Sequence, residues 1–234
     1  MSKKKLLAGA AAVLALVIIG GGAWYYETHI RVIPFPVDAK DSISSWTFKG
    51  AYSGNDTLIA NANADITKLT DLLGKGQYDD YDLHIGIGND YALMGEGSKA
   101  YEEYNIAVHI HPQKGLAYTN IANLFNQLGA YESAADAYTK AVRVEGGTLE
   151  YHKERLNYLT RQFPSDKTRV AAAFADASTQ FGDNADILFI EAQWLTGQGE
   201  YEKAIQAWER AKLLSPGRDT SAIDTEIARL KKKL

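Results

Sequence analysis

The sequence predicts an all-α fold: a solenoid of about four helical hairpins with capping helices, placed behind an apolar N-terminal helix. Three observations support this. A set of small and aromatic residues recurs at a period near 34 residues. Glycine or proline, which stop helices, stands after each recurrence. The first 26 residues contain an uncharged run that is long enough to span a bilayer.

The clearest unit is the helical hairpin around residues 129–142. Ala134, Tyr138 and Ala141 fall on one helix face, because residues three and four apart are neighbours on a helix surface. The alanines let a second helix approach closely, and the tyrosine fills the remaining space. Gly129 ends the preceding helix. The stretch therefore predicts two helices joined by a tight turn.

The same residue set recurs on both sides of this hairpin. Counted from Phe125, Ala134, Tyr138 and Ala141, the equivalents are Tyr91, Ala100, Tyr104 and Ala107, and then Leu195, Ala204, Trp208 and Ala211. A helix-stopping residue stands at the same distance after the last alanine of each set: Pro112, Gly146 and Pro216. This pattern resembles the tetratricopeptide repeat (TPR), a helix–turn–helix unit of 34 residues. The resemblance covers roughly residues 79–218 and implies a solenoid of helical hairpins.

Four repeats follow from this phase, near 81–114, 115–148, 149–184 and 185–218. Their helices are expected near 80–94, 98–111, 115–128, 131–144, 149–162, 166–181, 184–196 and 200–214. The third repeat is two residues out of phase, so that Val170, Phe174 and Ala177 take its packing positions. We expect the two extra residues at the turn 163–165, where Pro164 breaks the helix.

Helices are also expected at both ends of the repeats. Residues 55–78 contain a leucine- and isoleucine-rich stripe to about Leu73, typical of a helix that packs ahead of the first repeat. Residues 219–234 predict a final amphipathic helix. Both would cover the ends of the solenoid, because an end repeat has no neighbour to bury its apolar face.

The N-terminus predicts a membrane anchor. Residues 6–26 are uncharged, follow the lysine-rich residues 1–5 and end in Trp24, Tyr25 and Tyr26. Aromatic residues favour the membrane interface, and lysines favour the cytoplasmic side. We expect a single-pass inner- or cell-membrane protein with a cytoplasmic N-terminus and an extracytoplasmic TPR domain. The alternative is a cleaved signal peptide, with small residues Gly21 and Ala23 before a possible cut.

Residues 27–54 predict an extended stalk with an aromatic segment. Pro34 and Pro36 exclude a helix there, so residues 27–45 would lift the domain off the membrane. Trp46, Phe48 and Tyr52 follow. They indicate either an extended segment that packs on the first helix or a contact surface, and packing is the interpretation that we favour because buried aromatic residues dominate cores.

Composition argues against several functions. The chain has no cysteine, which excludes disulfides and cysteine nucleophiles. Its net charge is −4 despite three lysines in the first five residues, so nucleic acid is not an expected partner. His109 and His111 are two residues apart and do not share a helix face. We expect no enzyme activity, no cofactor and no metal site.

A row of amide side chains is the candidate binding site. The equivalent position of each first helix holds Asn89, Asn123, Asn157 and Gln193. The TPR resemblance implies that first helices line a concave groove. Asn120, Asn126 and Lys153 lie on the same or adjoining faces. An amide both donates and accepts hydrogen bonds and so can pair with a peptide backbone. The competing interpretation is that this face simply has to be polar.

The sequence therefore predicts a membrane-anchored scaffold that binds an extended segment of a partner protein in the TPR groove. Lys153 could add contact with a carboxylate. The alternative is a structural or assembly subunit of an envelope complex, such as a secretion or pilus-like assembly, with possible self-association. The fold by itself does not decide between them.

Overall fold

The structure is a computed structural model that describes residues 32–217 and 219–234. It divides into two units, residues 1–34 and residues 35–234. The expected anchor, residues 6–26, lies outside the described residues. No helix in the described part of the chain is both long and apolar enough to cross a membrane.

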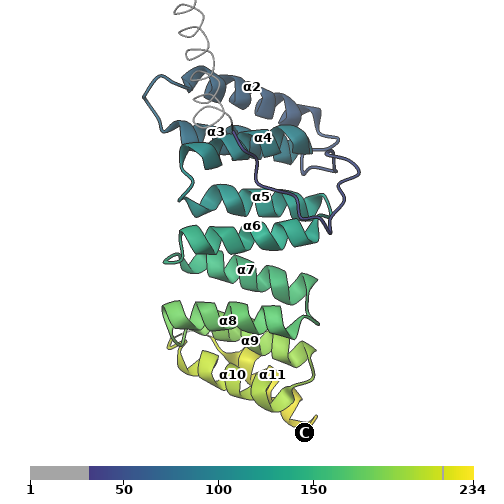
Figure 1. Ribbon diagram of the computed structural model, residues 1–234. Helices are drawn as coiled ribbons and strands as arrows, with labels where there is room; N and C mark the ends of the chain where they lie inside the picture. The colour runs from purple at the N-terminus through teal and green to yellow at the C-terminus, as the bar shows by residue number, and fades with distance from the viewer. Residues whose placement is uncertain (1–31, 218) are drawn as a thin grey trace, which may run out of the picture. The chain divides into compact units, whose positions relative to one another are not determined.

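The second unit consists of helices that follow one another along the chain (Figure 1). Their bounds are α2 Asp56–Leu72, α3 Asp80–Met94, α4 Gly97–Ile110, α5 Gly115–Gln127, α6 Tyr131–Val144, α7 Leu149–Gln162, α8 Lys167–Phe181, α9 Ala185–Gly197, α10 Tyr201–Leu213 and α11 Ser221–Lys231. The repeat helices lie within two residues of the expected positions. Between residues 32 and 234, apart from residue 218, the structure contains no strand, which confirms the all-α prediction for this part.

Helices pair into hairpins because alanines remove the bulk between them. Ala100, Ala134 and Ala204 are fully buried at these contacts. The closest pairs are α3 with α4, α5 with α6, and α9 with α10. In the first pair, a Cβ atom on Gly88 would lie only 2.5 Å from a ring carbon of Tyr104. Helices α3 and α4 therefore approach each other closely at this glycine.

The third hairpin, α7 with α8, accommodates the two extra residues of its repeat in the turn between its helices. Residues 163–166 separate the two helices, and Asp166 caps α8 by accepting a hydrogen bond from the Arg169 backbone N–H at 3.1 Å. Val170, Phe174 and Ala177 are buried. These three residues take the packing positions, as predicted from the two-residue shift.

The buried side chains form two hydrophobic clusters. The larger extends from α3 to α9 and includes Phe125, Leu156 and Val170, which are at most 2% exposed. The smaller joins α9, α10 and α11 around Trp208 and Leu230. Burying a side chain of this size stabilises the fold by roughly 1.5–3 kcal/mol. The C-terminal helix therefore covers the last hairpin with its own apolar contacts.

The expectation of a free stalk is wrong from Phe35 onward. Residues 35–53, which we call the strap, pack against the helices instead of leading away from them (Figure 1). The ring of Phe35 lies 5.9 Å from that of Tyr118 and 6.4 Å from that of Phe125, both on α5. Prolines keep this segment out of a helix, but its aromatic residues gain more by packing on the repeats than by remaining in water.

Two buried polar residues, each on the second helix of its repeat, hold the strap. The Asn105 side chain on α4 accepts a hydrogen bond from the Phe35 backbone N–H at 2.6 Å, and the Ser133 hydroxyl on α6 accepts one from the Asp38 N–H at 2.9 Å. Both side chains are at most 2% exposed. A buried polar group without a partner costs about 1–3 kcal/mol, so the strap satisfies groups that the repeats alone would leave unpaired.

The aromatic segment of the strap packs on the first hairpin. The rings of Trp46 and Tyr101 lie 4.8 Å apart. The Phe48 N–H donates to the Gly95 carbonyl at 3.2 Å, beside an isolated antiparallel bridge between Thr47 and Glu96. The favoured interpretation, packing, is confirmed for these residues. Trp46 contacts α4, the second helix of the first repeat.

Candidate peptide-binding groove

The four predicted amides are exposed, one on each first helix. Asn89 lies on α3, Asn123 on α5, Asn157 on α7 and Gln193 on α9. The residue directly before each amide in the chain is buried, so the amides mark the edge of the buried face of each helix. They meet in two cavities, the first shared by Asn89 and Asn123 and the second by Asn157 and Gln193.

The N-terminal cavity has a volume of about 390 Å³ and lies between α3, α5 and the strap. Asn89, Asn120 and Asn123 line it together with Gln127. Residues 48–51 of the strap contribute a further wall. The strap reaches this position because Gly50 is buried against the Leu93 carbonyl, at a distance that no Cβ atom could tolerate. The sequence did not indicate that the strap would border the amide face.

Tyrosine hydroxyls orient the first two amides. Tyr104 donates to the Asn89 side-chain oxygen at 2.9 Å, and Tyr138 donates to the Asn123 side-chain oxygen at 2.6 Å. Each tyrosine lies on the second helix of the same repeat, 15 residues after its asparagine. Burial raises the pKa of both hydroxyls, that of Tyr138 to about 12, so both are protonated at neutral pH. The sequence contains this recurring asparagine-to-tyrosine spacing, which could have indicated that the two side chains interact.

The two further asparagines on α5 are already engaged. Asn120 donates to the Asn89 side-chain oxygen at 3.2 Å. Asn126 accepts a hydrogen bond from Gln162 on α7 at 3.3 Å, which links neighbouring repeats. Asn120 lines the N-terminal cavity, whereas Asn126 is absent from the lining of both cavities. Asn120 therefore belongs with the amide row, and Asn126 contributes a contact between helices.

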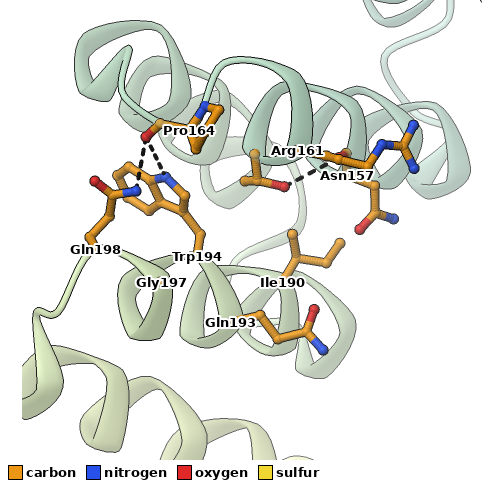
Figure 2. Close-up of a pocket in the computed structure, with 9 residues that line it drawn as sticks. Asn157, Arg161, Pro164, Ile190, Gln193, Trp194, Gly197 and Gln198 are labelled. Atoms are coloured by element: carbon orange, nitrogen blue, oxygen red, sulfur yellow. Dashed lines mark hydrogen bonds between the residues drawn. The ribbon is translucent and has the colours of Figure 1, made fainter.

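The C-terminal cavity has a volume of about 520 Å³ and has an aromatic wall (Figure 2). Trp194 donates its ring N–H to the Pro164 carbonyl at 3.2 Å, and Gln198 donates to the same carbonyl at 3.0 Å. Ile190 and Arg161 complete the lining beside Asn157 and Gln193. Figure 2 shows these side chains arranged around one space between α7 and α9. The cavity can therefore take an apolar group at the tryptophan and a polar group at the arginine.

Lys153 is placed differently from the amides. Its ammonium group lies 2.8 Å from Glu150 and 3.8 Å from Asp186. The hydrogen bond to Glu150 raises the pKa of Lys153. Two carboxylates thus offset its charge, and it lines neither cavity. The structure gives Lys153 less access to a bound carboxylate than the sequence suggested.

The histidines in the described ranges have local partners. His84 lies 2.6 Å from a Glu103 carboxylate oxygen, and His152 is buried with its ring 3.1 Å from the Gly146 carbonyl. Burial lowers the pKa of His152. Among the described residues, no group of three or more histidine, aspartate or glutamate side chains is arranged to hold a metal ion.

Comparisons with known structures identify the fold. No protein-family model and no curated protein matches the chain. The structure of MamA is similar, with a TM-score of 0.51 and 13% identity, over 75% of this chain and 93% of that one. BtubC from P. vanneervenii gives a TM-score of 0.58 and 14% identity, over 77% and 84%. A thermophilic TPR protein of Thermus thermophilus gives 0.50 and 16%, over 75% and 93%. The chain has the TPR fold.

Proposed function

We propose that this chain is a protein-binding scaffold, and that its amide row holds an extended segment of a partner protein. The observation that carries the proposal is the recurrence of an exposed amide in every repeat, paired two by two in cavities. An extended peptide presents an N–H and a carbonyl at each residue, and side-chain amides can pair with both. The contribution of the amides themselves depends little on the partner's sequence.

The magnitudes indicate that the amides act together with the cavities. A hydrogen bond contributes about 0.5–1.5 kcal/mol net, so four amides contribute roughly 2–6 kcal/mol. Micromolar binding requires about 8.2 kcal/mol. The remainder has to come from partner side chains buried in the cavities, where Trp194 and Ile190 offer apolar surface. The amides would then set the path of the peptide, and the cavities would select its side chains.

Cross-linking and pull-down with the full-length chain test this proposal. The variant changes Asn89, Asn123 and Asn157 to alanine together. We expect this variant to lose the partner that the unchanged chain captures. Asn63→Ala is the matched control, because Asn63 is an exposed asparagine on α2 whose side chain donates to the carbonyl of Ile59 in its own helix. Equal capture by the triple variant would exclude the amide row as the binding site.

We also propose that the scaffold lies outside the cytoplasm, anchored by residues 6–26. The support is the composition of that segment, uncharged between an N-terminal lysine cluster and an aromatic end. A protease added to intact cells or spheroplasts would then digest the repeats while sparing residues 1–5. Release of the protein from membranes by alkaline buffer would contradict the anchor. N-terminal sequencing of the mature chain separates an anchor from a cleaved signal peptide.

The exposed apolar residues near the C-terminal end favour a second candidate, a structural subunit that self-associates in an envelope assembly. Leu213 on α10 is 80% exposed and Leu234 is 66% exposed. Burying these side chains between two copies would remove apolar surface from water, which favours association. Light scattering should then show oligomers that dissociate when both leucines are changed to serine. A monomer at all concentrations would reject this candidate.

A further inference from the structure

The amide row is chemically asymmetric along its length. In the first two repeats, a tyrosine hydroxyl donates a hydrogen bond to the side-chain oxygen of Asn89 and of Asn123. The equivalent residues of the later repeats are Phe174, which has no hydroxyl, and Trp208, whose ring N–H has no hydrogen-bond partner in the described residues. Within those residues, the side chains of Asn157 and Gln193 also make no hydrogen bond. The first two amides are therefore held in place, and the last two are free to rotate.

The hydrogen bonds to Asn89 decide which of its atoms is available to a ligand. Its side-chain oxygen accepts from the Tyr104 hydroxyl at 2.9 Å and from Asn120 at 3.2 Å. A carbonyl oxygen has two lone pairs, so both are used. The amide nitrogen lies on the other side of the same planar group and is left for the cavity. Asn89 can therefore offer its partner hydrogen-bond donors and no acceptor.

We propose that Tyr104 and Tyr138 are positioning residues that hold the side-chain oxygens of Asn89 and Asn123 and leave their NH₂ groups to donate into the cavity, so that the N-terminal half of the groove recognises the carbonyl oxygens of an extended peptide. The inference rests on the proposed function and specifies which backbone groups are bound. The N-terminal cavity binds the carbonyl oxygens of the peptide backbone and not its N–H groups. The C-terminal cavity, where the amides can turn and Trp194 forms a wall, accepts either kind of backbone group and a larger side chain.

Nuclear magnetic resonance of the full-length chain tests the positioning without any ligand. The side-chain NH₂ resonances of Asn89 and Asn123 report the hydrogen bonds of each amide. Tyr104→Phe should shift the resonances of Asn89, and Tyr138→Phe those of Asn123, because each change removes a hydroxyl but keeps the ring. Tyr118→Phe is the matched control, since its hydroxyl donates to the Pro112 carbonyl at 3.0 Å, away from the amides. Unchanged NH₂ resonances in the two test variants would overturn the proposal.

Peptide titration on the same spectra tests the recognition of carbonyls. The probe is an acetylated, amidated decapeptide of alternating alanine and serine, titrated into the millimolar range. A thioamide analogue weakens its carbonyl acceptors, and a backbone N-methylated analogue removes N–H donors. Shifts at Asn89 and Asn123 should need about three- to tenfold more thioamide analogue, the loss of about one hydrogen bond, and no more of the N-methylated one. The opposite order would overturn the inference.

A double-variant cycle separates positioning from a loss of folding. Tyr138→Phe should weaken the peptide about three- to tenfold in the unchanged chain and have no further effect beside Asn123→Ala, because the hydroxyl acts through that amide. Equal losses in both backgrounds would reject a positioning role. If the unchanged chain shows no peptide-induced shift at any amide, the proposed backbone recognition fails, while the NH₂ resonances of the free protein still decide the positioning.

Discussion

The carboxylate of Asp41 caps a helix that begins 90 residues later in the chain. It accepts hydrogen bonds from the backbone N–H of Glu132 at 3.3 Å and of Ser133 at 2.6 Å, in the first turn of α6. It also accepts one from the Ser133 hydroxyl at 2.6 Å. The residue before α6, Ala130, has no side chain that could do this. A negative charge at this position also complements the helix dipole.

Asp41→Ala should therefore destabilise the fold by about 1–2 kcal/mol, because it removes both the cap and the partner of a buried hydroxyl. Urea unfolding at pH 7 measures the change in the free energy of unfolding. Asp38→Ala is the control from the same strap, since the Asp38 carboxylate accepts from the nearby Lys40 N–H at 2.7 Å and caps no helix. It should cost under about 0.5 kcal/mol. Similar losses for the two variants would mean that Asp41 does not act as a cap.

A second residue-scale prediction concerns two helical glycines with opposite surroundings. Gly88→Ala would place its Cβ atom 2.5 Å from the buried Tyr104 ring, and overpacking of this kind costs about 1–3 kcal/mol. Over most of that range the cost exceeds the helix-propensity gain of about 1 kcal/mol. Gly197→Ala meets no atom within 4 Å and should be neutral or stabilising. Thermal unfolding should therefore shift to lower temperature for the first variant alone.

Between elements, Glu200 links the third and fourth hairpins. It lies at the start of α10, 2.7 Å from Lys167 of α8 and 2.7 Å from Lys203. The hydrogen bonds with these lysines lower the pKa of Glu200 to about 2. Because the folded pKa lies below the unfolded value of 4.5, the contribution is complete above pH 4.5 and is lost as the pH falls toward 2.

We expect Glu200→Gln to flatten the pH dependence of stability between about pH 4.5 and 2. The effect is small because the group is exposed and solvent screens it. Unfolding midpoints of the unchanged chain and the variant, measured in steps across this window, give the difference. The curves should converge at the acid end. A constant offset at every pH would show that the carboxylate does not titrate in this way.

The elements themselves were largely predictable, because the hairpins repeat a local pattern. The spacing of Ala134, Tyr138 and Ala141 is enough to define a helix face. Because the same residue set recurs, it predicts the equivalent face in the other repeats. The strap was not predictable in the same way. Pro34 and Pro36 indicate what the segment cannot be, but its partners, such as Asn105 and Ser133, lie 70 to 95 residues away and follow no period.

The amide row shows the same division. Its four positions follow from the repeat phase, and all four are exposed as expected for a surface row. The orientation of each amide depends on whether the next helix provides a hydroxyl, as Tyr104 and Tyr138 do. The sequence contains the recurring spacing of 15 residues between each asparagine and its tyrosine. That spacing alone does not predict a hydrogen bond, because the bond depends on how the two helices pack.

At the scale of residues 35–234, the two hydrophobic clusters divide the stack near α9. Helices α8 and α9 contact each other less than the two helices of a hairpin do. In repeat proteins, each unit is stabilised mainly by its neighbours, so a weaker contact allows one part to open separately. Hydrogen exchange should therefore show α10 and α11 exchanging before α5 and α6. Uniform protection along the stack would indicate a single cooperative unit.

The strap also sets an order of events during synthesis. Residue 41 leaves the ribosome 92 residues before Ser133, its partner in the fold. At roughly 5–20 residues per second, Asp41 waits about 5–18 seconds for the helix that it caps. Helices α3 and α4 can pair during that interval and give the strap its first partners, Asn105 and Tyr101. The cap of α6 is therefore made first and can already be in place on the first hairpin when that helix forms, so the strap carries the order of synthesis into the order of folding.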